Sequence, residues 1–243
     1  MATKGELLYE GKAKQIYQTD NPEQVIIHYK DTATAFNGKK KEDIKGKGIL
    51  NNAISNIFFK QLEKKEIPTH LIEVLNDREI LAKKLDIIPL EVVVRNIIAG
   101  SLAKRTGLKE GTQIEGMVNE FYYKKDELGD PMINISHIKL LNLATEQEVV
   151  KLRNLSRNIN QHLRGLLRNR GILLVDMKLE FGRFGDQIIL GDEISPDTCR
   201  FWDAETNKIL DKDRFRNDMG ELIESYQEVF DRLKQLEGSN DKS

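Results

Sequence analysis

The sequence predicts an α+β fold in two lobes, a small strand-rich lobe over residues 1–86 and a larger lobe over residues 87–243. Three observations support this class. Short strand patterns dominate residues 7–30, longer strand patterns recur after residue 86, and amphipathic helix patterns lie between and after them. Strands and helices grouped in this way are typical of α+β proteins, and we expect helices to flank an antiparallel sheet in the larger lobe.

The composition describes a globular protein with no general affinity for nucleic acid or membranes. The chain has 243 residues, of which 32% are charged and 39% hydrophobic, and its net charge at pH 7 is −1. Without an overall basic field, nucleic acid and anionic membrane surfaces are poor partners. The N-terminus lacks an apolar signal region, and no run approaches the roughly 18 apolar residues of a membrane span. The single cysteine, Cys199, fits a reducing compartment, so we expect a cytoplasmic protein.

The first residues predict strands around a glycine-lysine turn. Strands are expected over Leu7–Glu10, Gln15–Thr19 and Val25–Lys30. Between the first two lies Gly11-Lys12-Ala13-Lys14, where a glycine lets backbone N–H groups approach an anion and two lysines supply charge for a polyphosphate. The pattern is neither a Walker motif nor G-x-G-x-x-G, and a solvated hairpin tip would carry the same residues.

A polar loop, a basic run and a helix follow. Asp31–Gly38 is interpreted as a loop, and the basic run Lys39–Lys47 comes next. Its glycines precede an amphipathic helix predicted over Ile49–Lys65, so the run could hold an anion at the helix N-terminus or form an exposed loop. Thr69–Leu75 is then expected to form a strand.

The most apolar strand pattern, Ile87–Ala99, contains a charged residue that needs a partner. Burying Arg95 is costly unless its guanidinium is paired. Gly100-Ser101 opens a short helical stretch after the strand, so Arg95 and Ser101 could form a phosphate clasp through bidentate donation and helix N–H groups. A structural pair between Arg95 and a carboxylate explains the residue equally well.

A polar turn region, Phe121–Met132, comes after an aromatic strand. Its charged residues Lys124, Asp126 and Asp130 are candidates for a site, but turn chemistry explains them as well.

Two long helices are predicted in the second half of the chain. The first begins at Thr145 with Glu148 three residues later, the capping-box pattern, and Gly171 stands at its expected C-cap. The second is expected over Arg214–Leu236, where its apolar stripe should dock on the sheet.

A charged β-hairpin between these helices is the strongest candidate for a chemical site. Side chains alternate along its first strand, so Asp176, Lys178 and Glu180 share one face. The opposite face is apolar and should pack on a core. It contains Val175, Met177, Leu179 and Phe181.

The turn of the hairpin, within Arg183–Asp186, decides which carboxylate of the second strand joins the charged face. A three-residue loop places Asp192 there, whereas a two-residue loop places Glu193 there, because each one-residue slip changes face. Carboxylates gathered around one lysine repel each other unless a cation or substrate lies among them. Hard oxygen ligands beside a phosphate site suggest magnesium. The alternative is a solvated strand face with cross-strand ion pairs.

These features together indicate a class of chemistry. Arg200, close after the acidic cluster, is a natural second anion anchor. Lysines for a polyphosphate, carboxylates for magnesium and arginines for a second anion suggest ATP-dependent phosphoryl or acyl transfer. A protein-kinase-like enzyme would need H-R-D and D-F-G, and the sequence contains neither. A nucleotide sensor without turnover would carry several uncompensated charges at a needless cost in stability.

Six stretches closely resemble the SAICAR synthetase (phosphoribosylaminoimidazole-succinocarboxamide synthase) family of purine biosynthesis. They span nearly the whole chain in the family's order: YEGKAKQIY, TAFNGKK, EVVVRNIIAGS, YYKKDELGDP, LLVDMKLEFG and LGDEISPDTCRFWD. The resemblance implies a ligase that joins the carboxylate of CAIR to the amine of L-aspartate through an acyl phosphate and converts ATP to ADP and phosphate. It also implies magnesium, a homodimer, and two α+β lobes with the nucleotide between them.

The resemblance further implies roles for individual residues. The turn over the ATP phosphates contains Lys12, Ala13 and Lys14. Magnesium would be held by Glu180 and Asp192, both also beside ATP, which favours the three-residue loop. The reacting centre would be lined by Asp176, Lys178 and Glu180. The CAIR site would include Arg95, Ser101, Lys178, Arg200 and Asp130. Lys124 and Asp126 match the same active-site region as Asp130.

Overall fold

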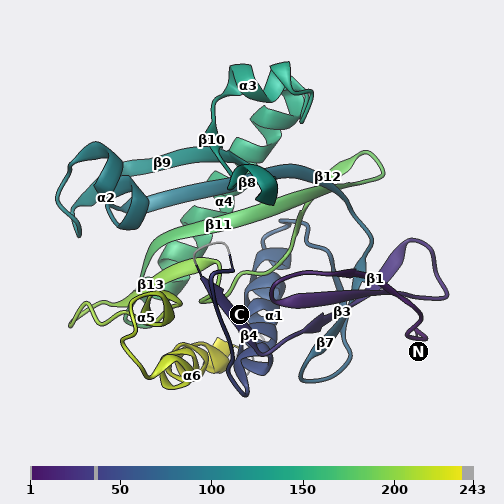
Figure 1. The fold of residues 1–243 in the computed structure, drawn as a ribbon, viewed down its shortest axis with the longest axis horizontal. Helices are drawn as coiled ribbons and strands as arrows, with labels where there is room; N and C mark the ends of the chain where they lie inside the picture. The colour runs from purple at the N-terminus through teal and green to yellow at the C-terminus, as the bar shows by residue number, and fades with distance from the viewer. Residues whose placement is uncertain (1, 36–37, 237–243) are drawn as a thin grey trace.

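The computed structural model describes residues 2–35 and 38–236 and contains three β-sheets with helices packed around them (Figure 1). Every pair of named strands is antiparallel. The predicted α+β class with antiparallel sheets flanked by helices is therefore confirmed. Among the described residues, no helix combines the length and the apolar character needed to cross a membrane.

The N-terminal sheet has the strand order β1-β2-β3-β7-β6. Its strands are β1 (Leu7–Glu10), β2 (Lys14–Gln18), β3 (Gln24–Tyr29), β6 (Leu71–Val74) and β7 (Glu79–Lys83). The glycine-lysine turn joins β1 to β2, as predicted. The sequence pattern does not predict β7, a short segment with charged ends whose Ile80, Leu81 and Ala82 are buried between β3 and β6.

The segment predicted as a loop from Asp31 to Gly38 contains a strand instead. β4 (Thr32–Ala35) pairs with β5 (Lys40–Asp43) in a separate hairpin. Ala33 and Ala35 are buried in a small cluster with Leu50 and Phe215, so tertiary packing overrides their weak strand preference. Two residues of this motif, Phe36 and Asn37, lie outside the described residues.

The basic run that follows is not a free loop. Its last lysine, Lys47, begins α1 (Lys47–Glu63) and is completely buried, with its ammonium 2.6 Å from an Asp197 carboxylate oxygen. Tyr226 donates to the other oxygen of Asp197 at 2.6 Å. Lys47, which the sequence offers as an anion ligand, is therefore already held in an internal ion pair.

The central sheet has the order β10-β9-β8-β11-β12, and β13 also pairs with β11. Its strands are β8 (Asp86–Ile97), β9 (Gln113–Tyr123), β10 (Met132–Ile133), β11 (Ile172–Phe184), β12 (Gln187–Gly191) and β13 (Cys199–Asp203). A short helical segment follows each of β8, β9 and β10. They are α2 (Gly100–Thr106), the 3₁₀ turn η1 (Asp126–Leu128) and α3 (Ile135–Leu140).

The long helix α4 (Glu146–Arg168) covers one face of this sheet (Figure 1). Thr145 and Glu148 form the predicted capping box. The C-cap is Asn169 rather than Gly171, which has φ +67° two residues further on. Apolar side chains of α4, the central sheet and the N-terminal sheet belong to one continuous core, so only the other face of the central sheet is available for chemistry.

The predicted final helix is divided in two. α5 (Asp213–Arg216) is separated from α6 (Leu222–Leu233) by Asp218, Gly220 and Glu221, which all have positive φ, and a 3₁₀ turn η2 (Lys234–Leu236) follows α6. Arg214 donates to the Gly220 carbonyl at 2.8 Å and fixes this break.

Candidate active site

The charged face of the central sheet is built by the pairing of β11 with its two neighbours. Asp176 lies opposite Arg95 of β8 and opposite Arg200 of β13, and Glu180 lies opposite Glu91 of β8. Asp176 and Glu180 are each 5% exposed, so these charges are held within the protein. The predicted alternation therefore brings Asp176, Lys178 and Glu180 together on one face.

The apolar face of β11 departs from the prediction at one residue. Met177, Leu179 and Phe181 belong to the main core, whereas Val175 lies in a separate small cluster with Ile97 and Ala99. The register of β11 on β13 shifts between Leu174 and Asp176, and this irregularity breaks the strict alternation at Val175.

Two lysines and two carboxylates form a connected set at the Glu180 end of this face. The Lys178 ammonium lies 2.6 Å from Glu91 and 3.0 Å from Glu180, and Lys124 lies 2.7 Å from the other oxygen of Glu180. Burial alone would lower the pKa of Lys178, but Glu180 and Glu91 outweigh it and hold that pKa above its usual range. Lys178 is therefore a fixed cation between two carboxylates.

The hairpin turn differs from the prediction, although Asp192 still joins the charged cluster. Phe184 pairs with Gln187, so the loop is the two-residue Gly185-Asp186, and the expected three-residue loop is wrong. Strict alternation would then put Glu193 on the charged face. However, β12 ends at Gly191, and Asp192 has φ +56°, a left-handed conformation that turns the chain out of the strand pattern.

Both acidic residues after β12 consequently reach the glycine-lysine turn. Lys14 forms ion pairs with Asp192 and with Glu193, the latter at 3.0 Å. Burial would raise the pKa of Asp192, but Lys14, Lys178 and Lys124 outweigh it and hold that pKa well below its usual range. Three lysines thus act on the Asp192 carboxylate: Lys14 of β2, Lys124 in the turn after β9, and Lys178 of β11.

The other residues of the glycine-lysine turn lie at the edge of this cluster. Lys12 forms an ion pair of 2.8 Å with Asp126 of η1, and both side chains are largely exposed. The Ala13 carbonyl accepts a hydrogen bond from the Lys30 N–H at 2.8 Å, and the Gly11 N–H donates to the Lys14 carbonyl at 2.8 Å. The turn therefore places Lys12 at the edge of the charged cluster and Lys14 within it.

The guanidinium of Arg95 is the centre of a second polar set. It donates to Glu120 at 2.8 Å, to Asp176 at 3.1 Å and to the Ser101 hydroxyl at 3.1 Å. Tyr122 accepts a further bond at 3.3 Å. The structure thus shows the carboxylate pairing that the sequence left open, and it also brings Ser101 beside Arg95 as the phosphate clasp requires.

Arg200 completes this set from β13. Its guanidinium donates to Asp176 at 2.7 Å and to Asp213 at 2.6 Å, so Asp176 is shared between two arginines. The guanidinium also lies against the backbone of Gly100, where an added Cβ would approach Nη2 to 2.6 Å. Arg95, Ser101 and Arg200 therefore surround the start of α2.

Asp130 has a local contact in the structure. Its carboxylate accepts the Lys125 N–H at 2.8 Å, and its φ of +48° places it in the turn after η1. This contact is the turn chemistry that the sequence indicates as the alternative to a substrate role.

Glu180 and Asp192 have the right chemistry for a magnesium ion bound together with a nucleotide. No group of three His, Cys, Asp or Glu side chains within residues 2–35 and 38–236 could hold a metal by itself. Magnesium, however, is usually bound by one or two carboxylates together with phosphate oxygens and water. Two carboxylates that now neutralise lysines fit this mode of binding.

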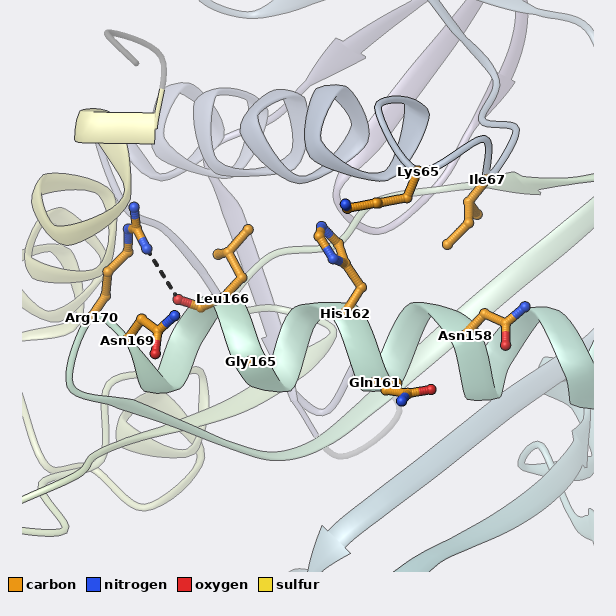
Figure 2. Close-up of a pocket in the computed structure, with 9 residues that line it drawn as sticks. All are labelled: Lys65, Ile67, Asn158, Gln161, His162, Gly165, Leu166, Asn169 and Arg170. Atoms are coloured by element: carbon orange, nitrogen blue, oxygen red, sulfur yellow. Dashed lines mark hydrogen bonds between the residues drawn. The ribbon is translucent and has the colours of Figure 1, made fainter. Parts of the chain in front are cut away.

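A separate hollow of about 650 Å³ lies between the end of α1 and α4 (Figure 2). Its lining includes Lys65, His162 and Arg170, with Gly165 at its centre. Because α4 covers the opposite face of the central sheet, this hollow is remote from the charged face.

Four residues that contact the predicted site residues were not identified from the sequence. They are Glu91, Glu120, Tyr122 and Asp213. Glu91 had a detectable signal, since it precedes Arg95 by four residues on the same strand and must share its face. The others depend on pairing between distant segments, which no local pattern reveals.

Comparison with known proteins gives matches along nearly the whole chain. The sequence profile of SAICAR synthetase matches residues 7–233. A phosphoribosylaminoimidazole-succinocarboxamide synthase of Clostridium kluyveri is 56% identical over 230 residues, which cover 95% of this chain and 98% of that protein. A protein of the same name from Persephonella marina is 56% identical and covers 97% of this chain and 99% of its own length.

Solved structures agree with these matches. The crystal structure of phosphoribosylaminoimidazole-succinocarboxamide synthase from Ehrlichia chaffeensis superposes with a TM-score of 0.92 at 52% identity, and the match covers 94% of this chain and 98% of that one. A SAICAR synthetase in complex with ADP also superposes with a TM-score of 0.92, at 49% identity, covering 98% of this chain and 100% of the other.

Proposed function

The chain belongs to the SAICAR synthetase family and is an ATP-dependent ligase of purine biosynthesis, and on that premise we propose that the charged face is its active site. The reaction joins the carboxylate of CAIR to the amine of L-aspartate and yields SAICAR, ADP and phosphate. The observation that carries the assignment is the placement of Lys178 between Glu91 and Glu180, on the same face as the pair of arginines that share Asp176.

ATP binds at the end of this face that is nearest to the glycine-lysine turn. Lys12 and Lys14 contact its phosphates, beside the backbone of Ala13, and Glu180 and Asp192 would hold the magnesium ion. Lys12 forms an ion pair with Asp126, Lys14 with Asp192, and Lys124 with Glu180. A magnesium nucleotide would exchange ionic partners with these groups, because its phosphates would pair with the lysines and Glu180 and Asp192 would hold the magnesium ion.

The ribonucleotide phosphate of CAIR binds at the other end of the face. Arg95 and Arg200 present guanidinium donors, and the Ser101 hydroxyl lies 3.1 Å from Arg95 at the start of α2. Asp176 holds both guanidinium groups in position, at 3.1 Å and 2.7 Å. Asp130 completes the substrate site from the turn after η1. This arrangement directs the imidazole carboxylate of CAIR toward Lys178.

The chemistry consists of two transfers at that carboxylate. An oxygen of the CAIR carboxylate attacks the γ-phosphorus of ATP, the bond to ADP breaks, and an acyl phosphate forms. The aspartate amine then attacks the acyl carbon, the bond to phosphate breaks, and the departing phosphate takes up the proton that the amine loses. Lys178 stabilises the charge that develops on the transferring oxygens, and Asp176 and Glu180 fix the surrounding cations. Magnesium bound to Glu180 and Asp192 would neutralise charge on the nucleotide phosphates.

The test is ADP release from purified protein with ATP and magnesium, with CAIR and L-aspartate added singly and then together. We expect ADP only when both are present, with one SAICAR formed per ADP. Nucleotide binding without turnover under every combination would instead leave a nucleotide-binding module.

Three further properties extend this proposal. Residues 1–86 act as the ATP-binding lobe and residues 87–243 as the lobe that carries the hairpin and the CAIR site. The enzyme acts in the cytoplasm, in keeping with its single buried cysteine, and it is a homodimer as the family resemblance implies. Sedimentation equilibrium would test the oligomeric state, and a monomer at assay concentration would contradict it.

A further inference from the structure

The Glu91 carboxylate of β8 lies on the charged face. It has no assigned contact with ATP or with CAIR. We propose that Glu91 is a positioning residue, which keeps the Lys178 ammonium at the reacting centre when Glu180 turns to the magnesium nucleotide. The inference rests on the proposed function, because it requires Glu180 to be a magnesium ligand.

The strand register places Glu91 for this role. Glu91 and Glu180 are direct cross-strand partners, and Lys178 lies two residues before Glu180 on the same face. Lys178 reaches diagonally to Glu91 at 2.6 Å and along its own strand to Glu180 at 3.0 Å. The Glu91 side chain is only 16% exposed, so this contact is shielded from bulk water.

The charges around Glu180 explain why Lys178 needs a second carboxylate partner. Lys124 occupies one oxygen of Glu180, and Lys178 occupies the other. A magnesium ion on Glu180 would meet two ammonium groups there, and like charges at that distance repel strongly in a partly buried site. Lys178 must therefore leave Glu180 when the metal binds, and Glu91 already holds it.

Without the Glu91 carboxylate, Lys178 would have one partner on this face and would remain on Glu180. Lysine and magnesium would then compete for the same oxygen. Partners that orient metal ligands commonly change metal affinity or activity by about 10- to 100-fold when removed. We expect a change of this size in the magnesium dependence of nucleotide binding.

The experiment measures ADP binding by calorimetry over a range of magnesium concentrations, with wild-type protein, Glu91→Gln, Lys178→Met and the double variant. Glu91→Gln preserves side-chain volume. Glu115→Gln serves as the control, since it removes an exposed carboxylate from β9 of the same sheet. We expect Glu91→Gln to raise the half-saturating magnesium concentration about tenfold or more and to leave metal-free ADP binding unchanged.

The double variant separates positioning from a general structural effect. In the Lys178→Met background, Glu91→Gln should change the magnesium dependence no further, because no lysine remains to compete. Glu91→Asp should restore part of the wild-type behaviour. The inference is overturned if Glu91→Gln matches the control, or if its effect persists in full without Lys178. Failure of the wild-type protein to bind ADP with magnesium would instead contradict the proposed function itself.

Discussion

Replacing Lys178 with methionine should almost abolish turnover and leave the fold intact. The ammonium lies 2.6 Å from Glu91 and 3.0 Å from Glu180, and 31% of the side chain is exposed, so it is accessible to substrate and held by two charges. Loss of one preorganised donor at a developing oxyanion costs about 10²–10³-fold in kcat. Because Lys178→Met removes both a donor and a full positive charge, we expect the upper end of this range.

The same contacts limit the damage to stability. Hydrogen bonds to charged groups contribute about 1.5–3 kcal/mol each, and removing the desolvation cost of the partly buried lysine offsets part of two such bonds. A net loss of about 1–3 kcal/mol would lower the Tm by roughly 2–12 °C in a protein of this size. The variant should therefore be folded at 25 °C, with an unchanged far-UV circular dichroism spectrum.

The assay is steady-state ADP release with saturating ATP, CAIR and L-aspartate. Lys139→Met is the matched control, because Lys139 is an exposed lysine paired with Glu146 on the surface. Activity of Lys178→Met within a few-fold of this control would refute the catalytic assignment of Lys178.

Three other substitutions test neighbouring parts of the account. Arg200→Ala should raise the KM for CAIR about 10- to 100-fold by removing a charged donor, and an effect confined to the KM for ATP would contradict the phosphate role. Gly100→Ala should lower stability by about 1–2 kcal/mol, because φ is +53°. It should also raise the KM for CAIR by displacing Arg200, whereas an unchanged KM would show that the guanidinium position is not critical. Arg183 and the Thr145 N–H lower the pKa of Glu148 from 4.5 to about 2, so its stabilisation is complete above about pH 4.5 and is lost as the pH falls through 2. Glu148→Gln should therefore cost about 1–2 kcal/mol in urea unfolding at pH 7 and almost nothing near pH 2, and a constant difference would be inconsistent with this titration.

The sequence was sufficient for two features that depend on local patterns. The two-residue period of β11 identified Asp176, Lys178 and Glu180 as one charged face. A one-residue shift of the strand would turn its apolar side chains away from the core. The capping box at Thr145 likewise located the start of α4. Both features depend on residues within a few positions of each other.

Features that depend on distant packing were beyond the sequence. Asp192 reaches Lys14 because of a left-handed residue after β12, which strand alternation cannot anticipate. β4 forms because Ala33 and Ala35 are buried against Leu50 and Phe215, and Lys47 is buried because Asp197 arrives from far along the chain. For β4 and for Lys47, a tertiary contact overrides the local preference.

The exchange of ionic partners at the charged face is tested most directly by a crystal structure with ADP and manganese, which replaces magnesium and can be located by its anomalous signal. We expect the metal between Glu180 and Asp192, with Lys14 moved from Asp192 to a phosphate oxygen and Lys178 retained on Glu91. A metal bound elsewhere, with the Lys14–Asp192 and Lys124–Glu180 pairs intact, would contradict the account.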